Sequence, residues 1–200
     1  MCYPAAVAPG TVVEQPFQMV DLMPTLLEAA GAAQPQGIDG RSVWAQLTKG
    51  AAPVHRDLYF EFGYARALMS DSLKYISFRY PDSLRQLLVN GEVNEAFSYK
   101  GALQDEPCFS RYPHYFDEDQ LYQVKADYGE QNNLAYDSAF AKPLVGLKQK
   151  LSAVLSTFAH PYPSVMEQDP FRRSATYQRL VDKAKAIDMN QYYWYRGECY

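Results

Sequence analysis

The sequence predicts an α+β fold in which a small four-stranded antiparallel sheet is covered by a C-terminal amphipathic helix. Four short runs rich in aromatic and aliphatic residues predict the strands, at 57–62, 66–69, 73–78 and 121–124. The second and third runs are separated by Ser70-Asp71-Ser72, which is typical of a tight hairpin. Such a sheet buries its apolar side only when another layer covers it.

The covering layer is predicted to be a helix over residues 144–158. Its apolar residues recur at spacings of three and four, and the polar residues between them are expected to face away. Pro143 is expected to set the start, because an interior proline breaks the backbone hydrogen bonding. The inward set is Leu144, Leu147, Leu151, Val154, Leu155 and Phe158, and the outward set is Lys148, Gln149, Lys150 and Ser152.

A helix is also predicted near the N-terminus, over residues 21–31. Asp21 can cap its free N–H groups, Pro24 suits the first turn, and Gly31 can end the helix in a left-handed turn. Its apolar residues form one broad face. They are Leu22, Leu26, Leu27, Ala29 and Ala30.

Weaker patterns fill the rest of the chain. A short helix is predicted over residues 42–47, with Ser42 as its cap, and a last helix over 174–187. The long segment 80–119 is expected to be mostly irregular, with a short helix near 83–89. A loop of that length usually has a function or is poorly ordered.

Composition and charge exclude several classes of protein. The net charge of −4 and the pI near 5.4 argue against a nucleic-acid partner, since phosphate binding needs clustered Lys and Arg. No apolar run approaches the roughly 20 residues of a membrane helix. The three cysteines are widely spaced and predict neither a disulfide framework nor a metal knuckle. The first residues lack a signal-peptide pattern, so a signal for export, if the intact protein has one, is expected upstream of Met1.

Three segments, taken in order, resemble the sulfatase family. Residues 20–31 (VDLMPTLLEAAG) and the following DGRS at 39–42 are similar to the family's D-x-x-P-T-L-L-x-x-A-G helix and D-G-x-S turn. Arg66-Ala67-Leu68 with Lys74-Tyr75-Ile76 is similar to its R-A-V…K-Y-I hairpin. Residues 121–135 are similar to L-Y-D-L-x-x-D-P-x-E-x-x-N-L-A, with departures at Gln123, usually Asp, and Tyr128, usually Pro.

This resemblance implies the alkaline phosphatase-like α/β fold, with a large N-terminal domain and a smaller C-terminal domain of four antiparallel strands capped by a helix. Residues 1–56 would then be a helical remnant of the large domain, including a strand at Val20. Residues 57–160 would be the antiparallel-sheet subdomain, and 161–200 a C-terminal helical extension.

The resemblance also implies a chemistry whose residues are missing here. Sulfatases hydrolyse sulfate esters with a formylglycine, made from Cys or Ser in C/S-x-P/A-x-R, and with a cation, usually calcium, held by Asp and Asn. Cys2-Tyr3-Pro4 matches C-x-P, but Ala6 stands where the Arg belongs, so Cys2 is not expected to be a nucleophile. We therefore expect no catalytic residue, metal or cofactor in this chain, with calcium and formylglycine implied for the intact parent.

Arg111 and His114 are the candidate substrate-binding residues. They lie in the 80–119 segment, and the corresponding loop of sulfatases lies close to the mouth of the active site. Either residue could help to hold an anionic substrate, and a structural or solvent role is the alternative.

Other polar residues are expected to be structural. Asp117-Glu118-Asp119 could suggest a metal site, but neighbouring acids in one loop cannot all face one ion, so a solvated acidic turn is expected. His55 is expected in a surface loop and His160 at a helix end. Arg66 and Lys74 are expected to serve hairpin packing and surface ion pairing.

Three functions stay open on the sequence. The leading one is the C-terminal part of a sulfatase that is inactive alone, whose parent acts on carbohydrate sulfates and is periplasmic or secreted. Its partners would be the sulfate ester and the missing N-terminal sulfatase domain, with no nucleic acid and no membrane. The alternatives are a non-enzymatic binding module with the same fold and a phosphoesterase of the same superfamily.

Overall fold

The computed structural model describes residues 3, 5–13, 16–52, 57–81, 113–114, 117–160 and 162–168, and single positions at 86, 90, 175, 178, 179 and 182. They divide into two units, residues 1–58 and 59–200. The helices predicted at 83–89 and 174–187 lie almost wholly outside the described residues and stay predictions. None of the described helices is long and apolar enough to cross a membrane.

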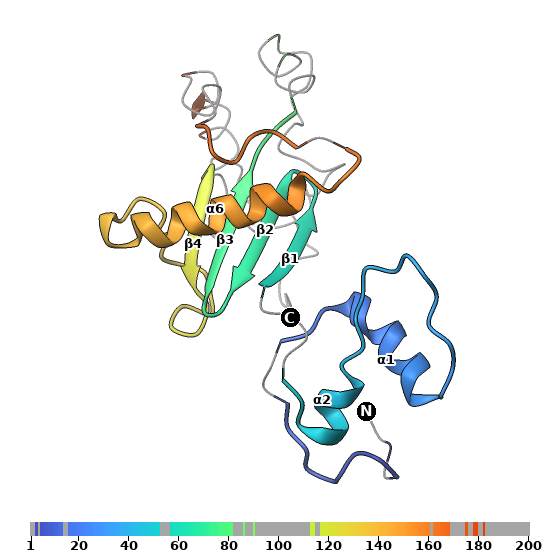
Figure 1. Ribbon diagram of the computed structural model, residues 1–200. Helices are drawn as coiled ribbons and strands as arrows, with labels where there is room; N and C mark the ends of the chain where they lie inside the picture. Colours follow the sequence, from blue (N-terminus) through green and yellow to red (C-terminus); the bar gives the residue numbers. More distant parts are fainter. Residues whose placement is uncertain are drawn as a thin grey trace, which may run out of the picture. The chain divides into compact units, whose positions relative to one another are not determined.

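The second unit is built on a four-stranded antiparallel sheet with the strand order β1-β2-β3-β4 (Figure 1). The register pairs Leu68 with Tyr75, and Tyr75 with Leu121. The predicted fold class is confirmed, although β4 begins two residues before the predicted start. The strands are β1 (Asp57–Phe62), β2 (Ala65–Ser70), β3 (Leu73–Phe78) and β4 (Asp119–Gln123).

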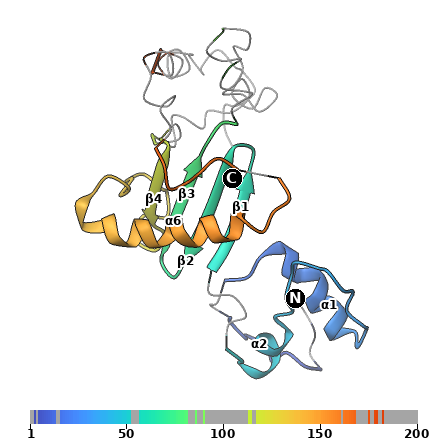
Figure 2. The ribbon, with the colours of Figure 1, turned by 45° about the horizontal axis from the view of Figure 1, so that its top comes forward.

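The helix α6 (Ala141–Leu155) lies across one face of this sheet (Figures 1 and 2). A 3-10 turn, η2 (Ser138–Phe140), leads into it. The helix begins before Pro143 rather than after it. Proline is tolerated there because the N–H groups of the first turn have no partner within the helix. The predicted helix was three residues too long, because α6 ends at Leu155; Phe158 lies beyond it, 44% exposed, with its ring 5.3 Å from that of Tyr59.

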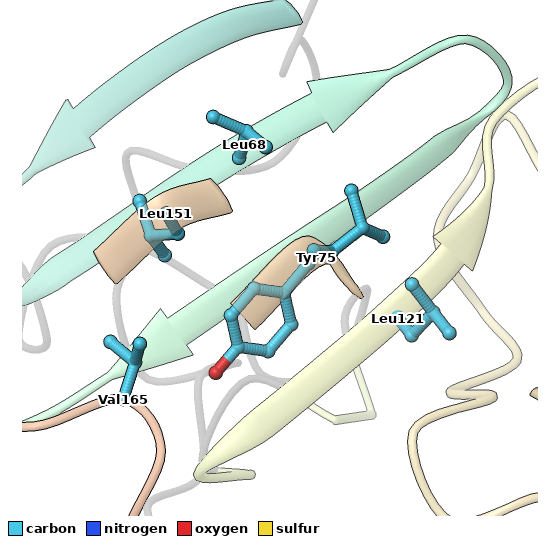
Figure 3. Packing of buried hydrophobic residues seen from close by; sticks show 6 residues of the cluster. Leu68, Tyr75, Leu121, Leu151 and Val165 are labelled. Atoms are coloured by element: carbon cyan, nitrogen blue, oxygen red, sulfur yellow. The ribbon is translucent and has the colours of Figure 1, made fainter. Parts of the chain in front are cut away.

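The core of this unit lies between α6 and the sheet. Figure 3 shows Leu68, Tyr75 and Leu121 of the strands gathered with Leu151 of α6 and with Val165. Val165 comes from the segment that follows α6, which the sequence patterns did not assign to the core. That segment is held to the sheet by Tyr162, whose hydroxyl oxygen lies 2.9 Å from the carbonyl oxygens of both Tyr64 and Ser77, with one proton to share between them.

A buried charge network joins β3, β4 and α6. The Asp119 Oδ1 atom accepts hydrogen bonds from the Tyr75 hydroxyl at 2.6 Å and from Arg79 Nη2 at 2.8 Å. Its Oδ2 atom accepts from Lys148 Nζ at 2.5 Å. Glu118 Oε1 lies 3.3 Å from Arg79 Nη2, so two cationic and two anionic side chains balance. Two predictions were therefore wrong, because Asp119 and Glu118 do not form a solvated turn and Lys148 does not face away.

The charged form of Asp119 is strongly favoured in this setting. Burial by itself would raise the pKa of this carboxyl group. The attraction of the Arg79 guanidinium and the hydrogen bonds from Lys148, Tyr75 and Arg79 outweigh burial and hold the pKa below its ordinary value. Ionisation of Asp119 therefore contributes to the stability of the folded state.

The first unit contains the short helices α1 (Leu22–Ala29) and α2 (Trp44–Lys49). As predicted, α1 ends near Gly31 (φ +65°). The N-cap position of α2 is Val43 rather than the predicted Ser42, although Ser42 Oγ accepts a hydrogen bond from the Trp44 N–H. The expected strand at Val20 is instead part of a 3-10 turn, η1 (Met19–Asp21). Asp21 makes no side-chain cap on α1, which corrects that prediction.

The apolar side of α1 is largely uncovered. Leu26 is 50% exposed and Leu22 is 37% exposed, as are substantial parts of their neighbours Met19, Val20 and Met23. Only Pro24 and Thr25 of the helix are buried among the described residues. The broad apolar face that the sequence predicts therefore exists without a covering layer in the described part of the first unit.

Replacing Leu151 with Ala should lower the free energy of unfolding by about 2–5 kcal/mol, because the Leu151 side chain is fully buried between α6 and the sheet. Lys150→Ala is the matched control. Lys150 is exposed and donates a hydrogen bond to the Ser70 hydroxyl at the surface, so its replacement should change stability by less than about 0.5 kcal/mol. Urea midpoints measure both, and equal effects would contradict the packing of α6.

Asp119→Asn should destabilise the second unit by about 3–5 kcal/mol, because it leaves Arg79 and Lys148 with one buried counter-charge too few. The lowered pKa fixes the sign of the pH dependence. The contribution of Asp119 is complete above its ordinary pKa of about 3.9 and disappears as the pH falls further. Urea titrations at several pH values should thus show the gap between the two proteins shrinking in acid. Asp71→Asn is the control. Asp71 is an exposed turn residue with φ +53°, a conformation that Asn also adopts readily, so this substitution should hardly change the free energy of unfolding.

Candidate functional site

The first sulfatase-like motif forms a structural clamp in the first unit. Asp21 Oδ1 accepts a hydrogen bond from the backbone N–H of Arg41 at 2.8 Å. Thr25 Oγ1 accepts from the Val43 N–H at 3.0 Å and donates to the Asp21 carbonyl at 2.6 Å. A Cβ atom on Gly40 would stand 1.9 Å from the Val20 carbonyl oxygen, so the close approach requires glycine. These residues hold the turn at 39–42 against α1. The Asp21 carboxylate and the Thr25 hydroxyl therefore already have hydrogen-bond partners within the chain.

The second and third motifs meet in the second unit. Lys74 Nζ lies 2.5 Å from Glu130 Oε1, which ties the β2–β3 hairpin to the loop after β4. Asp127 shapes that loop, because its carboxylate accepts the backbone N–H groups of Gln131 and Asn132 at 2.9 and 2.8 Å. These two N–H groups lower the pKa of Asp127. Both departures from the family pattern, Gln123 and Tyr128, are exposed and outside these contacts.

Asn133 is the best-connected polar residue of the third motif. Its Oδ1 atom accepts the N–H groups of Leu121 and Ala135, each at 2.9 Å. Its Nδ2 atom donates to Asp117 Oδ2 and to the Asp119 carbonyl oxygen, each at 2.9 Å. All four hydrogen-bonding positions of the amide are used, and a flipped amide would set donors against donors. The orientation of Asn133 is therefore unambiguous.

His114 lies at one end of this hydrogen-bonded chain. Its Nδ1 atom is 2.8 Å from Asp117 Oδ2, and the Asp117 N–H donates to the His114 carbonyl oxygen at 2.8 Å. About a third of each side chain is exposed, 35% for His114 and 33% for Asp117. His114 is the sequence-derived candidate that the structure describes. Asp117 and Asn133 were missed, although a carboxylate three residues from a histidine was a usable signal.

The other candidates divide into two groups. Arg111, Cys2 and His55 lie outside the described residues. Arg66 and Lys74 have the predicted structural roles. Arg66 Nε lies 3.4 Å from Glu61, and its guanidinium stands over the Tyr162 ring at 4.9 Å. His160 is exposed just beyond α6.

No group of three or more His, Cys, Asp or Glu side chains in the described part of the chain could hold a metal ion. The acidic triplet explains why in chemical terms. Glu118 and Asp119 are directed at Arg79 and Lys148, and Asp117 at His114 and Asn133. A cleft of about 430 Å³ in the first unit is lined by residues such as Thr11, Val13 and Thr48, and it contains no acidic cluster either.

Residues 1–80 match the family described as N-sulphoglucosamine sulphohydrolase, C-terminal. Among curated proteins, the chain is 29% identical over 142 residues to the multifunctional alkaline phosphatase superfamily protein PehA of Trinickia caryophylli. That alignment covers 70% of this chain and 24% of PehA.

Among solved structures, the chain resembles BT4656 in complex with its substrate D-glucosamine-2-N,6-O-disulfate, with a TM-score of 0.56 at 22% identity, over 82% of this chain and 29% of the other. A putative sulfatase from Bacteroides thetaiotaomicron VPI-5482 gives a TM-score of 0.43 at 21% identity, over 77% of this chain and 31% of the other. The BT4656 likeness concerns the fold alone. The chain spans about a quarter of the length of the relatives that it matches. Residues 1–80 are thus similar to the C-terminal part of N-sulphoglucosamine sulphohydrolase, and the fold of the described residues is similar to that of BT4656.

Proposed function

We propose that this chain is the C-terminal part of a sulfatase whose intact form hydrolyses sulfate esters of carbohydrates. The observation that carries the proposal is the matched N-terminal segment, in which Asp21, Thr25 and Gly40 build the clamp between helix and turn. The fold shared with BT4656, whose named substrate is a doubly sulfated glucosamine, supports a sulfated sugar as the ligand class.

Formylglycine and calcium would belong to the remainder of the intact enzyme. The described side chains do not fit a calcium site, since the three neighbouring acids are all engaged by cations, amides or imidazole. Calcium prefers six to eight oxygen ligands, which no described cluster supplies. We accordingly assign no step of the hydrolysis to this chain and expect it to be inactive alone.

The missing N-terminal domain is the proposed partner of the first unit. The exposed side chains of α1 and η1 form an apolar surface, and large contiguous surfaces of this kind mark interfaces. A helix of eight residues is too short to be stable in water by its own hydrogen bonds, so α1 needs a packing partner. A parallel sheet of the large domain, which is normally buried on both faces by helices, would supply one.

His114 and Arg111 are the proposed contacts of the chain with the substrate. His114 has a partly exposed imidazole that is held in place by Asp117, which suits a ligand contact better than a purely buried role. Arg111 precedes it by three positions and would add a positive charge for the sulfate group. In this proposal the chain contributes to substrate selection while the catalytic groups lie elsewhere in the parent.

A phosphoesterase of the same superfamily is the second candidate. The observation that favours it is the match to PehA, whose name places it in the alkaline phosphatase superfamily and calls it multifunctional. A non-enzymatic binding module is less well supported, because the exposed apolar surface of α1 is unsuited to a self-sufficient domain. The coding sequence upstream of Met1 separates these: a sulfatase fragment predicts C/S-x-P/A-x-R there.

The purified chain should not hydrolyse an aryl sulfate in the presence of calcium, because the described residues provide neither nucleophile nor metal cluster. The measurement is release of the aryl alcohol, with an intact sulfatase as the positive control. An aryl phosphate is assayed in parallel for the second candidate. Turnover that follows the chain through purification would contradict the proposal that it is inactive alone.

Leu26→Gln should weaken self-association of the isolated chain, because Leu26 is half exposed on the apolar surface of α1. Fully burying one leucine is worth about 1.5–3 kcal/mol, and about half of that is available to the half-exposed Leu26, so the dissociation constant should rise about three- to tenfold in sedimentation equilibrium. Val145→Gln changes a similarly exposed aliphatic residue on α6 and is the control. If both variants associate like the parent chain, the α1 surface is not an interface.

A further inference from the structure

The hydrogen bonds around Asn133 reach an imidazole through one carboxylate oxygen. Asn133 is held against β4 because its Oδ1 atom accepts from the Leu121 N–H and its Nδ2 atom donates to the Asp119 carbonyl oxygen, and Oδ1 also accepts from the N–H of Ala135 in the loop. Its Nδ2 atom donates to Asp117 Oδ2, the same oxygen that lies 2.8 Å from His114 Nδ1. The position of that oxygen is therefore set by the sheet, and the ring of His114 is aligned on it.

The shared oxygen determines which ring nitrogen of His114 carries the proton. An ionised carboxylate can only accept hydrogen bonds, so the 2.8 Å contact requires a proton on Nδ1. In the neutral imidazole the other nitrogen, Nε2, then has a lone pair and can only accept. No hydrogen bond to Nε2 is present among the residues that the structure describes, and the side chain is 35% exposed.

We infer that Asp117 and Asn133 are positioning residues that hold neutral His114 with Nε2 as an acceptor for a hydroxyl group of a carbohydrate ligand. The inference rests on the proposed function for the identity of the ligand, but not for the tautomer. A sulfate group offers only acceptor oxygens, so neutral His114 is matched to a sugar hydroxyl and not to the sulfate. The sulfate would need a separate cationic contact.

Nitrogen-15 NMR of the full, uniformly labelled chain tests the arrangement without a ligand. The tautomer is measured from the ring nitrogen shifts at a pH about 1.5 units above the ordinary histidine pKa of about 6.5. His114 should carry its proton on Nδ1. The exposed His160, in the same spectrum, should not share this preference.

Four variants separate positioning from a general structural role. Asp117→Ala should abolish the tautomer preference of His114. Asp117→Asn should keep it, since an amide oxygen can accept from both the ring and Asn133. Asn133→Asp keeps the two bonds accepted from Leu121 and Ala135, removes the donor to Asp117, and should reduce the preference. Asn133→Ala removes all four bonds and is the variant that can fail to fold, which the dispersion of the amide spectrum would reveal.

The outcomes are distinct. A preference for Nδ1–H in the parent chain that Asp117→Ala removes while the amide spectrum stays dispersed supports the inference. An equal mixture in the parent chain, or a preference that survives Asp117→Ala, overturns it. Titration with D-glucosamine-2-N,6-O-disulfate, the ligand named for BT4656, should then shift the His114 ring signals and not those of His160, with about fivefold weaker binding after Asp117→Ala. A correct tautomer with no shift would overturn the substrate role of His114 and leave the positioning intact.

Discussion

One carboxylate, that of Asp119, connects the three elements on which the second unit depends. It accepts hydrogen bonds from Tyr75 of β3, from Arg79 just after that strand, and from Lys148 of α6. Desolvating four charged groups is costly unless they balance, and here Arg79 and Lys148 face Asp119 and Glu118. Each buried charge offsets the desolvation cost of an opposite charge on another element. The end of β3, the start of β4 and one side of α6 are therefore expected to pack together cooperatively.

The motifs by which the chain resembles sulfatases have, in the described residues, a mechanical role. Asp21 and Thr25 use their oxygens on backbone N–H groups, and Lys74 and Glu130 tie a hairpin to a loop. The side-chain amide of Asn133 accepts two hydrogen bonds and donates two, so all of its hydrogen-bonding positions are occupied. Residues of this kind specify a fold and the positions of loops, so they are recognisable even where no reaction takes place. The resemblance can therefore rest on structural residues such as Asp21, Thr25 and Asn133, which need not react with any substrate.

Periodicity predicted the strands and α6 well, because both are local patterns of apolar residues. Periodicity could not predict the buried charge network, because its members are far apart in the sequence. Arg79 and Asp119 are 40 positions apart, and Lys148 lies 29 positions beyond Asp119. Lys148 carried a signal that was overlooked: it stands four residues after Leu144 and three before Leu151, within the buried stripe. His114 was singled out from the sequence, but its alignment by Asp117 and Asn133 could not be, because it depends on how the loop after β4 folds back.

The connection between β3 and β4 has its two ends locked together. Phe78 N donates to the Glu118 carbonyl oxygen at 3.0 Å, and Arg79 binds the same carbonyl from 39 positions earlier in the chain. Because the two ends are held together, the chain between them is a closed loop. The entropic cost of closing such a loop grows only with the logarithm of its length. Doubling the insert would cost about 0.6 kcal/mol, far less than the loss of one buried ion. The connection between β3 and β4 can therefore differ greatly in length and sequence with little effect on the stability of the sheet that holds its ends.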